Sequence, residues 1–126
     1  MYMQSKNKYS GIIVPTVTPL TANYKLDHEA AEKMFANFSN NRVMPFILGT
    51  TGESASLPIS LKKDFIDLAS NLKTSETTLY AGIASNVFDE SVELAKYCFD
   101  KGIDAVAANL PSYYTLSNHQ VTCLPQ

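Results

Sequence analysis

Four short apolar runs alternate along the chain with three longer segments in which apolar residues recur every three or four positions. The runs span residues 11–14, 46–48, 78–83 and 103–110. Short runs without polar alternation are typical of strands buried on both faces of a parallel sheet. The longer segments between them have the periodicity of helices that bury one side.

The three predicted helices begin at N-cap residues Asp27, Ser60 and Asn86, because short polar side chains accept hydrogen bonds from free amides of the first turn. Gly102 is predicted to end the third helix. Ser117 or Asn118 is predicted to cap a fourth helix. The expected buried positions are Ala30, Ala31, Met34, Phe35 and Phe38, then Leu61, Phe65, Leu68, Ala69 and Leu72, then Phe88, Val92, Ala95 and Phe99 with Cys98 beside them.

Strand and helix therefore alternate, which predicts an α/β fold of about four parallel strands with three right-handed helical crossovers. This order alone does not decide whether the sheet is open or closes into a barrel. We expect a tail at residues 1–9, one domain at 10–121 and a non-native C-terminal tail at 122–126.

Composition narrows the function classes. The 126 residues include 10 Lys+Arg and 12 Asp+Glu, giving a net charge of -2, and no basic cluster that would hold nucleic acid phosphates. No apolar stretch approaches the roughly 20 residues that span a bilayer. The two cysteines, Cys98 and Cys123, lack metal-type spacing. These observations predict a cytoplasmic protein with no metal, no cofactor, no nucleic acid partner and no membrane partner.

The loop after the second predicted strand carries the clearest candidate chemistry, with Gly-Thr-Thr-Gly-Glu at residues 49–53. Ligands of parallel α/β proteins bind in such loops. The two glycines permit close approach of a ligand, and the threonine hydroxyls and amides could hold a small anion such as a carboxylate. From spacing alone, a simple strand-to-helix turn is the favoured interpretation. The loop after the fourth strand adds Tyr113 and Tyr114, of which one could present its phenol as a proton relay.

Four segments, at residues 11–19, 49–53, 81–82 and 111–114, closely resemble the dihydrodipicolinate synthase and N-acetylneuraminate lyase family. The resemblance reverses the interpretation of loop 49–53 as a simple turn. It implies the N-terminal half of a (β/α)8 TIM barrel, as found in class I aldolases and lyases that bind pyruvate or another 2-oxo acid as a Schiff base on a lysine. It also implies a homo-oligomer, usually a tetramer.

The resemblance implies roles for individual residues. Thr51, together with the Thr50 and Thr51 amides beside Gly49, would bind the carboxylate of the 2-oxo acid. The Thr50 hydroxyl would relay a proton to Tyr114, which would reach across a tight dimer; Tyr113 stays an alternative for that tyrosine. Synthase-like and lyase-like features are both present, so the second substrate, whether aspartate semialdehyde, sialic acid or a sugar acid, stays open.

The Schiff base lysine has no counterpart at a predicted strand end. In the family it lies on the sixth strand, and a full barrel needs about 250 residues. The chain is therefore predicted to be inactive by itself. One explanation is a partial copy of an enzyme; the alternative is a non-catalytic short protein that self-associates or binds a full-length relative.

Overall fold

Strands and helices alternate along the chain, as predicted, in a computed structural model that describes residues 7–112 and 114–122. The elements are β1 (Ile13–Pro15), α1 (His28–Asn40), β2 (Met44–Ile47), a 3-10 turn η1 (Ser54–Ser56), α2 (Ile59–Leu72), β3 (Tyr80–Gly82), α3 (Phe88–Asp100), β4 (Ala105–Ala107) and α4 (Asn118–Thr122). The predicted C-terminal tail at 122–126 lies outside the described residues except for Thr122.

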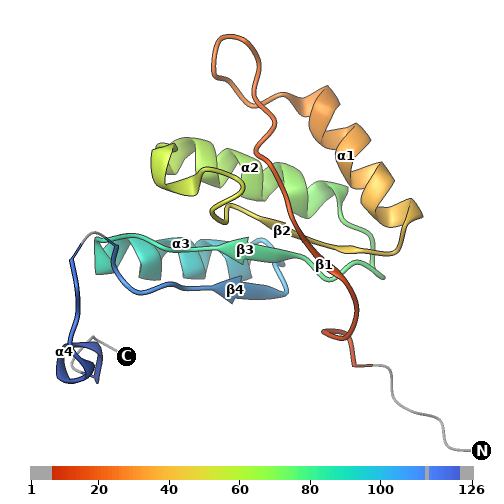
Figure 1. Ribbon diagram of the computed structural model, residues 1–126. Helices are drawn as coiled ribbons and strands as arrows, with labels where there is room; N and C mark the ends of the chain where they lie inside the picture. Colours follow the sequence, from red (N-terminus) through yellow and green to blue (C-terminus); the bar gives the residue numbers. More distant parts are fainter. Residues whose placement is uncertain (1–6, 113, 123–126) are drawn as a thin grey trace, which may run out of the picture.

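The four strands form one parallel sheet in the order β1-β2-β3-β4, which confirms the predicted fold class (Figure 1). Pro15, Phe46, Tyr80 and Ala105 are successive register partners across it. The carboxyl ends of the strands therefore meet at one edge, and the loops that follow them lie close together.

The helices α1, α2 and α3 form one layer against the sheet, with α1 contacting α2 and α2 contacting α3, whereas α4 lies apart from that layer (Figure 1). Burial of apolar side chains between the two layers is the main force that holds them together. The core consists of Phe35, Ile47, Leu48, Phe65, Ile66, Ala69, Leu79, Ala81, Ile83, Leu94, Cys98 and Ile103. No helix of the described residues is long and apolar enough to span a membrane.

The predicted caps have mixed outcomes. Asp27 caps α1 as expected, because its Oδ1 accepts a hydrogen bond from the Ala30 amide at 3.0 Å. The prediction for Ser60 was wrong, since α2 begins at Ile59, directly after Pro58, whose extended backbone forms the N-cap. The prediction for Asn86 was also wrong: Val87 is the N-cap of α3, and the Asn86 Oδ1 instead accepts from the Ser112 amide at 2.8 Å.

The short helix α4 starts with a reciprocal cap. The Ser117 Oγ accepts a hydrogen bond from the Gln120 amide at 3.3 Å, and the Gln120 Oε1 accepts from the Ser117 amide at 2.8 Å. This is the capping box arrangement, in which the side chain of each of the two residues accepts a hydrogen bond from the backbone amide of the other. Of the two candidates, Ser117 is therefore the cap.

The buried side of α3 differs in part from the prediction. Cys98 is buried as expected and Leu94 is buried too, whereas Phe88 and Phe99 are 42% and 55% exposed. Apolar residues occur around more than one side of this helix, so periodicity alone did not identify the side that faces the sheet. Burial raises the pKa of the Cys98 thiol to about 11, because the thiolate would lose its hydration.

The strands are shorter than predicted or shifted by one or two residues, and Pro45 lies inside β2 rather than at or before its start. Its position explains why it is tolerated. The Met44 amide donates to the carbonyl of Ile12, the residue just before β1, so the backbone of the next residue along β2 points toward β3. The register pairs Phe46 with Tyr80, the first residue of β3. The missing Pro45 donor therefore faces a point before β3 begins.

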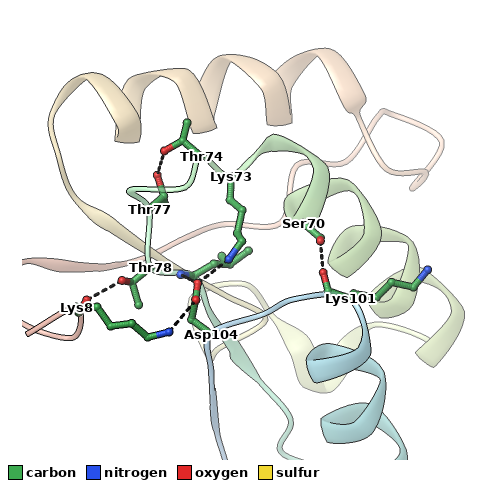
Figure 2. A network of polar contacts seen from close by, with 9 residues as sticks. Lys8, Ser70, Lys73, Thr74, Thr77, Thr78, Lys101 and Asp104 are labelled. Atoms are coloured by element: carbon green, nitrogen blue, oxygen red, sulfur yellow. Dashed lines mark hydrogen bonds and ion pairs between the residues drawn. The ribbon is translucent and has the colours of Figure 1, made fainter.

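Asp104, just before β4, holds the amino edge of the sheet, where the strands begin. Its carboxylate accepts hydrogen bonds from Lys8 Nζ at 3.1 Å, Lys73 Nζ at 2.8 Å and the Leu79 amide at 2.9 Å (Figure 2). The Thr78 hydroxyl donates to the Lys8 carbonyl at 2.6 Å. These contacts hold the segment before β1 against the amino ends of β3 and β4.

Candidate functional site at the carboxyl edge of the sheet

A cavity of about 750 Å³ lies at the carboxyl edge, where the loops after β2, β3 and β4 converge. This is the end of a parallel α/β sheet at which ligands bind. Its polar lining comes from Thr50, Glu53, Ser54, Ser56, Lys62, Ser85, Asn86, Glu90, Asn109 and Ser112. Apolar side chains, among them Phe46 and Leu48, form much of the remaining wall.

The loop after β2 has a tightly defined backbone. Leu48 and Glu53 adopt positive φ angles of 56° and 54°, in the left-handed region that few non-glycine residues enter. The Glu53 amide donates to the Thr50 carbonyl at 3.0 Å, and the Ser54 amide donates to the Gly49 carbonyl at 3.3 Å. These two bonds turn the chain back on itself, and Gly49, Thr50 and Glu53 of this loop line the cavity.

A second contact fastens this loop to the segment after β1. The Thr18 hydroxyl donates to the Gly52 carbonyl at 2.7 Å. A Cβ atom on Gly52 would lie 3.1 Å from both the Thr16 carbonyl oxygen and the Thr18 hydroxyl, so these neighbours would have to shift by a few tenths of an ångström. Glycine at this position therefore lets the loop lie close to the segment after β1.

The predicted site residues are only partly brought together. Gly49 and Thr50 line the cavity. Thr51 follows on the same loop, but it is exposed and outside the lining. Tyr114 is 72% exposed and also outside the lining. Tyr113 lies outside the described residues, so the choice between the two tyrosines stays open.

Most polar residues in the lining, among them Lys62, Glu90 and Ser54, were not singled out as site residues from the sequence. Lys62 reaches the cavity from α2 and is half-buried. Glu90 of α3 accepts a hydrogen bond from the Ser85 hydroxyl at 2.8 Å. Ser54 is buried, and its hydroxyl has no hydrogen-bond partner among the described residues. Lys62 and Glu90 were treated as helix residues; a test for the first turns of helices that follow strand-end loops would have found them.

Within residues 7–112 and 114–122, no group of three or more His, Cys, Asp or Glu side chains is placed to hold a metal ion. The cavity instead offers hydroxyls, amides, the Lys62 ammonium group and the carboxylates of Glu53 and Glu90. The hydroxyls, the amides and the ammonium group can each donate a hydrogen bond to the carboxylate of a small organic ligand. The fold and this cavity define a parallel α/β protein whose candidate site lies at the carboxyl ends of the strands.

Comparison with known proteins identifies the family. Residues 8–122 match the model of the dihydrodipicolinate synthetase family, and the chain belongs to that family. A 4-hydroxy-tetrahydrodipicolinate synthase of Campylobacter curvus is 34% identical over 110 residues, covering 86% of this chain and 37% of that protein. The chain thus spans little more than a third of this curated relative.

Solved structures agree on the fold. The 2-keto 3-deoxygluconate aldolase from Picrophilus torridus superposes with a TM-score of 0.82 and 29% identity, over 88% of this chain and 40% of that one. YagE of E. coli K12, a prophage protein of the dihydrodipicolinic acid synthase family in complex with pyruvate, gives a TM-score of 0.84 at 23% identity, over 90% and 39%. The four-stranded sheet therefore corresponds to the N-terminal part of the relatives' barrel.

Proposed function

We propose that this chain is the amino-terminal part of a class I aldolase or lyase, and that it supplies the carboxylate-binding loop for pyruvate or another 2-oxo acid. The observation that carries the proposal is the placement of Gly49 and Thr50 on the wall of the carboxyl-edge cavity. The amides of Thr50 and Thr51, with the Thr51 hydroxyl, would donate hydrogen bonds to the carboxylate. Hydrogen bonds to a charged acceptor are stronger than those between neutral groups.

The Thr50 hydroxyl and a tyrosine, Tyr114 in our assignment, would carry protons during the reaction. The tyrosine would come from a neighbouring subunit of a tetramer, and the protein would work in the cytoplasm. The Schiff base lysine would come from strands beyond the four present. Its absence predicts that the chain is inactive by itself.

Pyruvate binding tests the loop. Pyruvate added to the 15N-labelled chain should shift the amide signals of Gly49, Thr50 and Thr51. The change Thr51→Val keeps the shape of the side chain but removes its hydroxyl, and should weaken pyruvate binding by about tenfold, the value of one hydrogen bond to a charged group. Thr77→Val is the matched control, since Thr77 lies before β3 and its hydroxyl contacts only Thr74 in the described structure. Unshifted loop amides, or equal affinity of the Thr51 variant and the control, would contradict the proposal.

Borohydride trapping tests the missing nucleophile. A Schiff base forms from a neutral amine in a dry pocket, and Lys62, the lysine in the described lining, is half-buried on a helix rather than at a strand end. Incubation with pyruvate and borohydride should therefore leave the intact mass of the chain unchanged. A reduced pyruvyl adduct on any lysine, which peptide mapping of the wild type and of Lys62→Arg would locate, would refute this prediction.

A further inference from the structure

The loops after β3 and β4 begin next to each other, because these two strands pair in parallel up to their carboxyl ends. Just beyond β3, the Ile83 amide donates a hydrogen bond to the Ala107 carbonyl of β4 at 2.9 Å. From there the two segments separate, since one turns into α3 and the other runs through Ser112 toward α4. Contacts between the two loops therefore help to decide where the loop after β4, which carries Tyr114, is held.

The side chain of Asn86 joins these two loops. Its Oδ1 accepts a hydrogen bond from the Ser112 amide at 2.8 Å and a second one from the Ser112 hydroxyl at 3.3 Å. A carboxamide oxygen has two lone pairs and can accept both. A flipped carboxamide would place its own N–H groups against the Ser112 N–H and lose the stronger of the two bonds. The contact therefore requires an oxygen acceptor at position 86.

The turn that carries Asn86 is itself held in place. The Ser85 hydroxyl accepts a hydrogen bond from the Val87 amide at 3.0 Å and donates one to the Glu90 Oε2 at 2.8 Å. The Glu90 amide in turn donates to the Val87 carbonyl at 3.1 Å, in the first turn of α3. Since both of its neighbours are fixed, Asn86 loses little further backbone freedom when its side chain bonds to Ser112. Such a prearranged acceptor costs less conformational entropy to bind than a mobile one.

We propose that Asn86 is a positioning residue for the loop after β4. It holds Ser112, two positions before Tyr114, at the wall of the cavity that Thr50 also lines. The inference rests on the function proposed above, in which Thr50 and Tyr114 carry protons, because such groups act only within hydrogen-bond reach of their partners. Loss of the Asn86 oxygen releases the loop after β4. The loop at residues 49–53 stays in place, since its own hydrogen bonds hold it.

Hydrogen exchange of the Ser112 amide, measured by NMR on the 15N-labelled 126-residue chain without pyruvate, tests the contact. Asn86→Ala removes the acceptor and should speed this exchange by about tenfold, the upper value of one ordinary hydrogen bond. Asn86→Asp keeps an oxygen acceptor and should retain the slow exchange of the wild type. Asn71→Ala, at an exposed position of α2, is the matched control and should also retain it. Equal exchange in the wild type and in a folded Asn86→Ala variant would overturn the proposal.

Pyruvate separates a positioning role from a merely structural one. Its addition to the wild type and to Asn71→Ala should shift the amide signals of both Thr50 and Tyr114. In Asn86→Ala, the Thr50 signal should still shift, whereas the shift of Tyr114 should be lost.

Two outcomes of this titration would refute the role of Asn86 and leave the carboxylate-binding loop as proposed. In one, Tyr114 shifts equally in Asn86→Ala and in the control; in the other, Tyr114 stays still in a wild type whose Thr50 signal moves. A wild-type Thr50 signal that does not move would instead refute the proposed function, and with it the role of Asn86 in that function. The exchange of the Ser112 amide would still report the contact itself.

Discussion

Replacing Gly82 by alanine should destabilise the folded chain by about 3 kcal/mol or more, or prevent folding. A Cβ atom on Gly82 would lie 2.1 Å from the Leu48 carbonyl oxygen and 2.8 Å from its carbonyl carbon. Both obstructing atoms belong to backbone, so no side-chain rotation relieves the clash. β2 and β3 would have to separate where the loop of residues 49–53 begins.

Gly102→Ala is the matched control. Gly102 has a φ of 84°, but a Cβ atom there would meet nothing within 4 Å. Its substitution should cost only the strain of the left-handed region, about 1–2 kcal/mol. Urea unfolding of the wild type and of both variants measures the difference. If Gly82→Ala proved no less stable than Gly102→Ala, the close approach of Leu48 and Gly82 would be wrong.

The same contact explains how the fold positions the candidate site. Leu48 is buried and has a positive φ, a conformation that costs a non-glycine residue free energy. Packing of its side chain in the core and the space left by Gly82 hold it there. The strained residue directs the chain out of β2, so that Gly49 and Thr50 face the cavity. The geometry of the loop thus depends on a glycine one strand away.

The fold could be predicted from the sequence because its signals are local. Asp27 caps α1 through an amide three residues away, and the alternation of apolar runs with helical periodicity identified a parallel sheet. The loop at residues 49–53 stood out because a glycine-rich segment directly follows a strand, but its spacing alone favoured a simple turn, and only the resemblance to the family gave it a role. Each of these inferences uses neighbours within a few positions along the chain.

The features that the sequence did not predict depend on contacts between segments far apart along the chain. The role of Asn86 could not be predicted, because its side chain bonds to Ser112, 26 residues further along. Leu48 has a positive φ, and its carbonyl lies where a side chain on Gly82, 34 positions further along, would stand. The buried side of α3 was missed because Phe88 and Phe99 are as apolar as the residues that face the sheet. Tertiary packing decided among local alternatives in all three cases.

Replacing Asp104 by alanine should destabilise the chain by about 2–3 kcal/mol at neutral pH. The side chain is 17% exposed, and its loss leaves the Leu79 amide without its carboxylate partner and releases two lysines. The lysines regain water more easily than the amide does, since Lys8 is 55% exposed. Most of the loss therefore comes from the amide and from the looser segment before β1. Asp104→Asn keeps an acceptor for the amide, so this control should lose less.

The pH dependence of stability separates the charge of Asp104 from its shape. Burial by itself would raise the pKa of Asp104, but hydrogen bonds from Lys73, the Leu79 amide and Lys8 outweigh it and lower that pKa below its usual range. The unfolded chain therefore takes up the proton first, near pH 4. The stabilisation is fully present above that pH and is lost as the pH falls through the lower, folded-state pKa. In urea unfolding between pH 7 and pH 3, the advantage of the wild type over Asp104→Asn should shrink on the acid side. An advantage that stays constant over this range would show that the charge of Asp104 does not contribute to the free energy of unfolding. Lys8 and Lys73 would then be hydrated rather than held in ion pairs with it.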